Sequence, residues 1–262
     1  MENKEIKKKN PISIISPFIG IFIVFCIWLV VSRLEIFSTY VLPTPEKVFR
    51  SFLKMLESGE LFVDIGISFG RVLKGFLIAF VLAFALGMLR ILVPIAEKYY
   101  EMLVQFFRNV PPLSMIPLLI LWCGIGETTK LIIIVLAAFF SMYLSIVKGF
   151  RDCDKRLLEV GTVFGYTQWE QFTRIVLPHA MGDILVGMRI GMGYSWRAII
   201  GAEMVAASTG LGHMILFAQQ MSRTDKVIVG IFVIGIVGLV TDKLFGMVIK
   251  RLFRGMGENG WN

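Results

Sequence analysis

The sequence predicts an all-α, polytopic membrane protein with six transmembrane helices in one domain. Of its 262 residues, 56% are hydrophobic, whereas soluble domains are typically about 45–50% apolar. The mean hydropathy is +0.75. Several apolar runs reach about 20 residues, which is the length that a helix needs to cross a hydrocarbon core of about 30 Å.

The distribution of positive charge predicts the orientation. Six spans with both termini in the cytoplasm place fourteen of the 27 Lys and Arg residues in inner segments and seven in outer segments. Lys and Arg accumulate in the cytoplasmic loops of membrane proteins. The net charge of +8 therefore indicates a membrane topology and no nucleic-acid partner. Three widely spaced cysteines, Cys26, Cys123 and Cys153, predict no metal site.

The chain begins with a basic cytoplasmic tail over residues 1–11, followed by a first span at about 12–33. A charged sequence, and not a run of small residues, follows this span, so we expect a retained helix and no cleaved signal peptide. A short helix is predicted over 45–57, with Thr44 as its N-cap and Pro45 in its first turn. This helix is amphipathic and too charged to span, so it is expected to lie on the outer surface of the membrane.

The second span, at about 65–92, carries Arg71 and Lys74 in its outer part, where both side chains are expected to extend to the interface. The third span, at about 100–122, is broken by proline, which removes a backbone donor and clashes with the preceding turn. Its arginine and prolines are Arg108, Pro111, Pro112 and Pro117. Such a backbone persists in a membrane only where protein or water satisfies it. We therefore expect this span in the interior of the bundle.

The fourth span covers about 130–148, the fifth about 180–206 and the sixth about 227–249, before a cytoplasmic tail at 255–262. Glycines recur in the last two spans and allow close helix packing. Between the fourth and fifth spans lies a polar segment, 151–178, on the predicted cytoplasmic side. Because so long a segment is kept in water, it is predicted to bind a soluble partner.

This cytoplasmic segment combines a helix break with aromatic side chains. Gly165 permits a tight turn. Phe164, Trp169 and Phe172 are expected to enter a groove on the partner, because large aromatic residues commonly anchor interfaces. Glu159 is expected to pair with a basic residue of that partner. An amphipathic loop that lies on the lipid headgroups is the alternative.

The spans also contain charges, which are costly in a bilayer and usually face other helices or a water-filled path. In the fifth span, Arg189 and Glu203 are about 40° apart around the helix, and Arg197 lies between them in sequence. One hypothesis is that this face attracts a passing anion, since arginine suits oxyanion geometry. The other is that the charges form structural pairs between helices. The candidate path residues are Arg108, Pro111, Pro112, Arg189, Arg197 and Glu203.

The spacing of the cytoplasmic segment resembles the EAA signature of ABC importer permeases, which reads Glu-Ala-Ala, three residues, Gly, nine residues and Ile-x-Leu-Pro. The residues at the matching positions are Glu159, Gly165, Ile175, Leu177 and Pro178. Val160 and Gly161 replace the two alanines. Four further stretches are similar to the permease subunit of nitrate/sulfonate/taurine-type ABC importers, and together the resemblance covers residues 40–254. They are VLPTP from Val41, RNVPP from Arg108, LLILWCGIG from Leu118 and AEM from Ala202.

This resemblance implies the type I ABC importer permease fold (MetI-like) in a prokaryotic inner (plasma) membrane. It implies a path for a small anion of the sulfonate, taurine, nitrate or bicarbonate class. Its implied partners are a second permease subunit in a homodimer, two ABC ATPase subunits, an extracytoplasmic substrate-binding protein and the lipid bilayer. The implied ATPase-docking residues are Glu159, Gly161, Phe164, Gly165, Tyr166, Trp169, Phe172, Ile175, Leu177 and Pro178. The chain has no Walker A sequence, so ATP and Mg²⁺ are expected on the ATPase, with no cofactor and no enzymatic activity in this chain.

Two other classes of transporter remain as alternatives. An ion-gradient-driven secondary transporter or channel often contains a matched pair of broken helices, whereas this sequence has one strongly broken span. The membrane coupling subunit of vitamin transporters carries Ala-Arg-Gly motifs, and Ala-Arg-Gly does not occur here. Uptake that stops on ATP depletion, with the ion gradient held constant, separates the ABC importer from the ion-driven class.

Overall fold

The computed structural model describes residues 12–34 and 36–252. The predicted tails at 1–11 and 255–262 lie outside these ranges. Within them, every regular element is a helix. This confirms the predicted all-α class.

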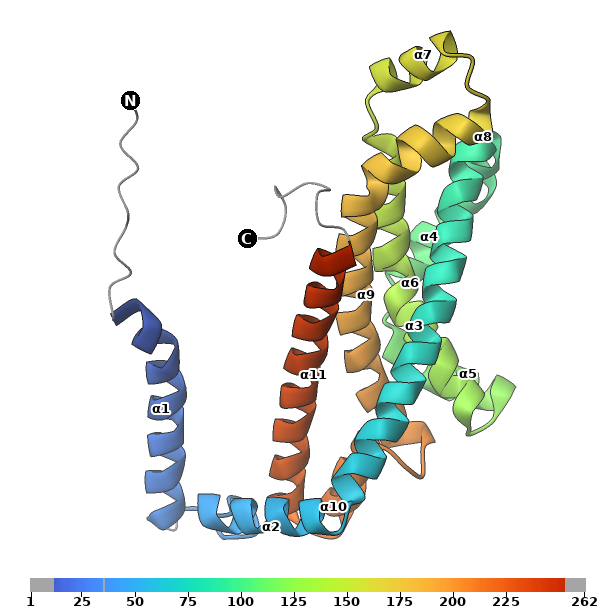
Figure 1. Cartoon of the computed structure of the whole chain (residues 1–262). Coiled ribbons are helices and arrows are strands. Elements are labelled where there is room, and N and C mark those ends of the chain that lie inside the picture. Colours follow the sequence, from blue (N-terminus) through green and yellow to red (C-terminus); the bar gives the residue numbers. More distant parts are fainter. Residues whose placement is uncertain (1–11, 35, 253–262) are drawn as a thin grey trace, which may run out of the picture.

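Eleven α-helices follow one another in the described chain (Figure 1). They are α1 (Ile12–Arg33), α2 (Pro45–Glu57), α3 (Glu60–Leu92), α4 (Glu97–Arg108), α5 (Ile116–Cys123), α6 (Glu127–Arg151), α7 (Lys155–Val163), α8 (Gln168–Gln171), α9 (Leu177–Ala206), α10 (Leu211–Gln220) and α11 (Thr224–Leu252). Two 3₁₀ turns, η1 (Pro94–Ala96) and η2 (Pro112–Met115), and one π-helical turn, η3 (Phe172–Val176), lie between them.

Four stretches of the described chain are long and apolar enough to cross a membrane. They are α3, α6, the continuous helix from Gln168 to Ala206, and α11. The bent pair formed by α4 and α5 with their adjoining turns supplies a fifth. α1 contributes a shorter apolar stretch, Phe22–Arg33, so the predicted count of six spans stays a prediction.

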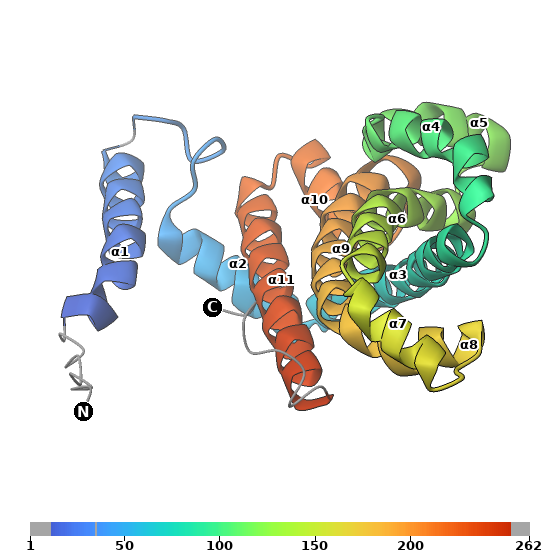
Figure 2. The same cartoon turned by 90° about the horizontal axis from the view of Figure 1, so that it is seen from above.

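The core of the bundle is α6, which packs between α3 and α9 (Figure 2). α11 lies beside α9. α2 and α10 lie at one end of the bundle, and α7 and α8 at the other (Figure 1). α1 stands apart from the other spans, and its Trp28 ring lies 6.4 Å from that of Phe232 in α11. The two ends of the bundle are therefore different in kind, with a flat layer of short helices at one and a projecting segment at the other.

The third predicted span is broken at its prolines. Its two halves, Pro94–Arg108 and Pro112–Cys123, meet at 92°. The expectation that it lies in the interior of the bundle was wrong for the single chain. No residue of α4 is buried, and α5 buries only Ile116 and Leu119. The helix ends where proline removes backbone donors, and the chain turns there, which leaves both halves on the flank of α6 (Figure 2).

Glycines let α6 and α9 approach each other closely. A Cβ atom added at Gly187 would lie 2.5 Å from Ser145 Cβ, and one added at Gly191 would lie 2.4 Å from Met142 Cε. Gly182, on the same helix, has no atom within 4 Å of such a position. The contact between α6 and α9 therefore depends on particular glycines and not on the glycine content of the helix.

Candidate functional site

A groove lined by arginines runs along the bundle. Three adjoining cavities form it, with volumes of about 310, 420 and 380 Å³. Arg108 and Leu144 line both the first and the second cavity, and Tyr194 and Arg197 line both the second and the third. We call the three together the arginine groove. Its arginines are Arg90, Arg108, Arg151, Arg189 and Arg197.

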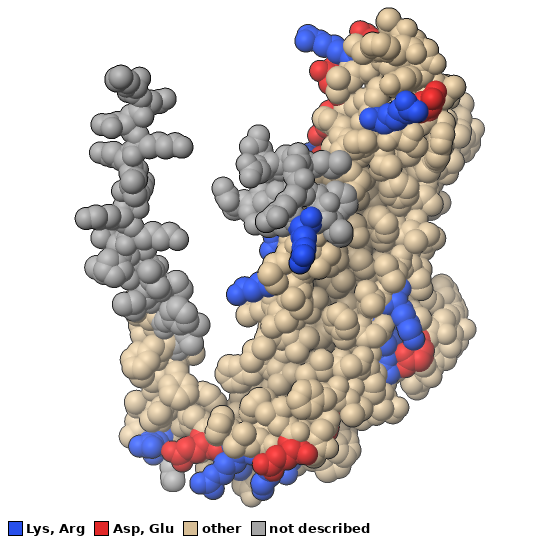
Figure 3. Space-filling view, in the orientation of Figure 1, with Lys and Arg blue, Asp and Glu red and all other residues tan. Residues whose placement is uncertain are grey.

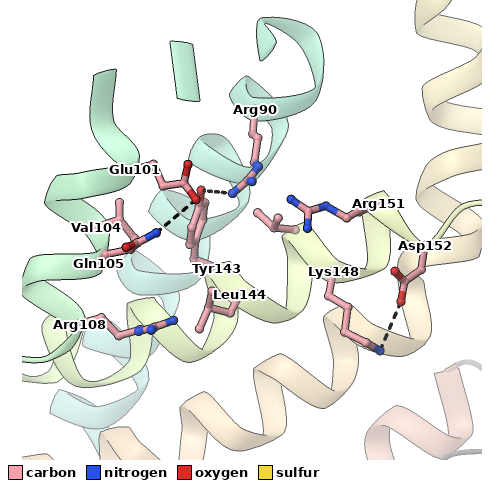
Figure 4. A pocket seen from close by; sticks show the side chains of 11 residues that line it. Arg90, Glu101, Val104, Gln105, Arg108, Tyr143, Leu144, Lys148, Arg151 and Asp152 are labelled. Atoms are coloured by element: carbon pink, nitrogen blue, oxygen red, sulfur yellow. Dashed lines mark hydrogen bonds and ion pairs between the residues drawn. The ribbon is translucent and has the colours of Figure 1, made fainter. Parts of the chain in front are cut away.

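The first cavity lies near the end of α6 from which the segment 151–178 continues (Figure 4). Two of its cations are neutralised: Arg90 pairs with Glu97, and Lys148 Nζ lies 2.7 Å from Asp183 Oδ1. Arg108 extends into the same cavity from the last residue of α4. This end of the groove therefore balances two of its four cations, Arg90 and Lys148, within the chain.

The second cavity lies halfway along the bundle. Its α6 wall is formed by residues between Leu136 and Leu144, in the middle of a helix of 25 residues. Arg108 and Pro112 reach it from the break between α4 and α5, and Arg197 reaches it from α9. Three of the predicted path residues thus meet at one cavity, although α9 is distant in sequence from the broken span. The break in the third span is what places a charged residue there.

The arginines of the groove differ in their partners. Arg189 donates two hydrogen bonds to Asp242 of α11, from Nε to Oδ1 at 2.8 Å and from Nη2 to Oδ2 at 2.7 Å. Among the described residues, Arg108 and Arg197 have no carboxylate partner. The guanidinium of Arg197 instead lies 5.2 Å from the ring centre of Tyr194. The second cavity therefore carries two cations whose charge is not neutralised nearby.

Glu203 lies outside the groove, in a buried cluster that joins α3, α6 and α9. Its side chain is 0% exposed, and its Oε1 accepts from Arg71 Nη1 at 2.7 Å. Ser68 Oγ lies 2.9 and 2.8 Å from its two carboxylate oxygens. Arg71 also donates to both oxygens of Glu127, at 2.9 and 2.7 Å. These contacts favour the structural-pair hypothesis for Glu203 over a role in the path.

The partner of Glu203 could not be found from the sequence. Arg71 was expected to extend to the interface, and this was wrong, because the residue is only 7% exposed. Its two acidic partners lie 56 and 132 residues away in the chain. The sequence signal was an arginine within a largely apolar span, which gives no partner. Arg189, which was placed on the same face as Glu203, pairs with Asp242 instead.

The same buried cluster fixes the loop that leads into α10. Gly212 N–H donates to Glu203 Oε2 at 3.0 Å, and the carbonyl of Thr209 accepts from Arg71 Nη1 at 2.8 Å. Gly210 has a φ of +109°, a conformation that residues with a side chain rarely adopt. The loop is therefore fixed by hydrogen bonds to the buried Arg71 and Glu203 and by the backbone conformation of Gly210.

The segment 151–178 projects from the end of the bundle opposite α2 and α10 (Figure 1 and Figure 3). α7 ends at a turn in which Gly165 has a φ of +75° and Tyr166 N–H donates to the carbonyl of Gly161 at 2.9 Å. Thr167 then begins α8 with a capping box, in which Thr167 N–H donates to Glu170 Oε2 at 3.0 Å. The turn and the cap give this projecting segment a defined shape.

Exposure within this segment differs from residue to residue. Phe164 and Trp169 are 73% and 57% exposed and are available to a partner. Phe172 is 4% exposed, with its ring 5.5 Å from that of Phe150 and 5.8 Å from that of Trp169. The expectation that Phe172 enters a partner's groove was wrong. The Phe172 side chain instead points inward and packs against Phe150 of α6 at the base of the projecting segment.

The remaining residues of the EAA-like motif also divide into exposed and packed positions. Glu159 is exposed on α7. Gly161 is buried, and a Cβ atom there would lie 2.8 Å from Ile175 Cδ1. Leu177 and Pro178 are the first residues of α9. A glycine where the signature has alanine thus lets η3 pack closely against α7.

One continuous helix joins the projecting segment 151–178 to the arginine groove. It runs from Gln168 to Ala206 over 39 residues, which is about 58 Å at 1.5 Å per residue. The π-helical turn at Phe172–Val176 lies near its start, and such turns often occur at functional sites. Arg189 and Arg197 lie farther along the same helix. The last part of the projecting segment and one wall of the groove are therefore parts of one helix.

Comparison with known proteins agrees with this arrangement. A family model described as "Binding-protein-dependent transport system inner membrane component" matches residues 75–254. The aliphatic sulfonates transport permease protein SsuC of Bacillus subtilis is 36% identical over 88% of this chain and 84% of its own length. The taurine transport system permease protein TauC of Escherichia coli is 29% identical over 90% and 88%. In fold, the chain is similar to an amino acid ABC transporter crystallised with histidines, with a TM-score of 0.64, 15% identity, and coverage of 76% of this chain and 98% of the other.

Proposed function

This chain belongs to the family of binding-protein-dependent transport system inner membrane components, as the permease subunit of an ABC importer, and we propose that its cargo is a small sulfonate or a related oxyanion. The family implies a multi-pass membrane subunit that is not itself an enzyme, with a separate ATPase subunit and a substrate-binding protein as partners. The cargo class is supported by the names of the sulfonate and taurine relatives and by the unneutralised arginines of the groove.

The observation that carries the proposal is the continuous helix from Gln168 to Ala206. Its first residues form part of the exposed segment with Phe164 and Trp169, which we propose as the ATPase-docking surface. Farther along, it supplies Arg197 to the groove. ATP and Mg²⁺ bind the ATPase, and closure of that subunit pushes the docking surface. Movement of this helix then opens the groove to the outside and later to the inside.

We also propose that a second copy of this chain completes the path. The groove is open along the flank formed by α4 and α5, and α4 has no buried residue in the described chain. Apolar side chains there are widely exposed, with Met102 at 82% and Leu121 at 80%. A symmetric pair, which is the commonest arrangement of soluble oligomers, would cover part of this surface and enclose the arginines between two copies.

The function is tested with the complete transporter in proteoliposomes, which contain the permease, its ATPase and its binding protein. We expect uptake of radiolabelled ethanesulfonate that requires ATP inside and persists when ion gradients are abolished. Uptake that continues without ATP and follows an imposed ion gradient would replace this proposal with the ion-driven alternative.

The orientation of the chain can be tested with its own cysteines. Cys123 and Cys153 lie just before and just after the spanning helix α6, and Cys123 is exposed whereas Cys153 is buried. Burial also raises the pKa of the Cys153 thiol and lowers its reactive thiolate fraction. We expect a membrane-impermeant maleimide, added to whole cells, to label a variant that keeps only Cys123 and not one that keeps only Cys153. A Cys123-only variant that is labelled only after the cells are permeabilised would invert the proposed topology.

The docking surface is tested by replacing Phe164 with serine. The side chain is 73% exposed, so its loss removes a potential interface anchor, typically about 2 kcal/mol or more at such positions, with little effect on folding. We expect at least a tenfold weaker association with the ATPase in detergent and a proportional loss of uptake. Phe62→Ser is the matched control, because Phe62 is 66% exposed and lies in α3 at the other end of the bundle. Equal ATPase binding by both variants and the parent would exclude Phe164 from the interface.

A further inference from the structure

We infer that the second cavity of the arginine groove is a binding site for one monovalent oxyanion, held by Arg108 and Arg197, at the middle of the membrane. The inference rests on the proposed function. It adds the site at which the transported anion binds and the residues that select this anion. Both guanidinium groups line a single cavity of about 420 Å³, and among the described residues neither has a carboxylate partner.

The first support is the contrast among the charged residues of this bundle. Arg71 and Arg189 each have a carboxylate at 2.7 Å, as expected for charges that must be stabilised within a bilayer. Arg108 and Arg197 lack this compensation. An arginine in a mid-membrane cavity without a counter-ion in its own chain is most stable when an anion from outside supplies the missing charge.

The second support is the depth of the cavity. Its α6 wall, between Leu136 and Leu144, is the centre of a spanning helix, about 18 Å from either helix end at 1.5 Å per residue. A lipid headgroup lies at the membrane surface and does not reach this depth. The broken span contributes Arg108 and Pro112, and broken helices commonly form substrate sites near the midplane of transporters. The occupant is therefore a free solute.

The third support is the character of the remaining wall. Phe140 and Leu136 give an apolar surface, and the Ser141 hydroxyl and the Tyr194 ring lie in the same lining. Two guanidinium groups beside an apolar wall match an ion with one charged oxyanion head and a short aliphatic body. A short alkanesulfonate has this chemistry. A cation is repelled by the two arginines, and a fully apolar solute leaves them without a counter-ion.

The test measures binding without the substrate-binding protein, so that the outer selectivity of that protein does not contribute. The permease with its ATPase is placed in lipid nanodiscs, and binding of radiolabelled ethanesulfonate is measured directly. A charge-assisted hydrogen bond typically contributes about 1.5–3 kcal/mol, which corresponds to an affinity ratio of roughly 10–100. We therefore expect Arg197→Gln and Arg108→Gln each to weaken binding about tenfold or more, and Arg197→Lys to weaken it less than Arg197→Gln.

Arg50→Gln is the control, because Arg50 is an exposed arginine on α2, at the end of the bundle away from the docking surface. Its binding affinity should equal that of the parent. The thermal unfolding midpoint of the Arg108 and Arg197 variants should equal that of the parent, which separates lost binding from lost folding. Equal ethanesulfonate affinity in the parent and both variants overturns the site, as does the absence of saturable binding to the parent. Either result leaves the proposed function standing if ATP-driven uptake is still observed.

Discussion

Replacing Arg71 with methionine is expected to destabilise the permease by about 3–5 kcal/mol, the range measured when one partner of a buried ion pair is removed. Glu203 would keep its charge at 0% exposure and lose its 2.7 Å contact with the guanidinium. Glu127 would lose two further hydrogen bonds, and the carbonyl of Thr209 a third. Since whole domains are stable by only about 5–15 kcal/mol, we expect little folded Arg71→Met protein in the membrane.

The measurement is the yield of folded protein and its thermal unfolding midpoint in mild detergent. Lys74→Met is the matched control, because Lys74 lies three residues farther along α3, is exposed, and has no ion-pair partner in the described ranges. Glu203→Gln should fall between the two. It removes the charge but leaves oxygen and nitrogen atoms to bond with Ser68 and the Gly212 amide. An unfolding midpoint for Arg71→Met equal to that of Lys74→Met would show that the cluster does not stabilise the fold.

Replacing Gly187 with valine is expected to separate α6 from α9 and to lower stability by about 1–3 kcal/mol or more, the usual effect of overpacking. The first added atom alone would lie 2.5 Å from Ser145 Cβ and 3.4 Å from Met142 Cα. Because the backbone fixes the position of a Cβ atom, a side-chain rotation of Ser145 cannot relieve the 2.5 Å conflict. Valine adds two more carbons, so the helices must move apart. Uptake should fall with stability, because α9 also carries the arginines of the groove.

Gly182→Val provides the comparison on the same helix. Nothing lies within 4 Å of a Cβ atom at Gly182, so this variant changes helix propensity and leaves helix packing unaltered. We expect its thermal unfolding midpoint to lie near that of the parent and several degrees above that of Gly187→Val. Equal midpoints for the two valine variants would contradict the close approach of α6 and α9 at this position.

The fold class followed from the sequence because its physical cause is local. Apolar runs long enough to cross a bilayer are visible in any 20-residue window, and prolines mark the broken span. The direction that the broken span takes in the folded protein is not determined by its local sequence. The two halves of the span meet at 92°. Whether α4 lies inside the bundle or on its flank depends on how these halves pack against the other helices, and no spacing within residues 100–122 contains that information.

The candidate site was predictable in parts only. The projecting segment followed from its polarity, its glycine turn and its EAA-like spacing. The inward position of Phe172 was not predictable, because it depends on Phe150 in another helix. Arg108 and Arg197 were candidates by charge, but their meeting at one cavity requires the folded bundle. Ion pairs between distant helices, such as Arg71 with Glu203, have no signature in a single sequence.

The crowding around Glu203 has a consequence for the way this protein varies among species. An added methyl group at Gly210 would lie 2.4 Å from a Glu203 oxygen, and one at Gly212 would lie 2.3 Å from the backbone oxygen of Ile200. The two glycines should accordingly be retained in related chains even where the acid is lost, because Gly210 keeps its φ of +109° and Gly212 still faces the Ile200 backbone. A saturation library at Gly210 and Gly212, selected for growth on the cargo as sole sulfur source, should return glycine almost alone.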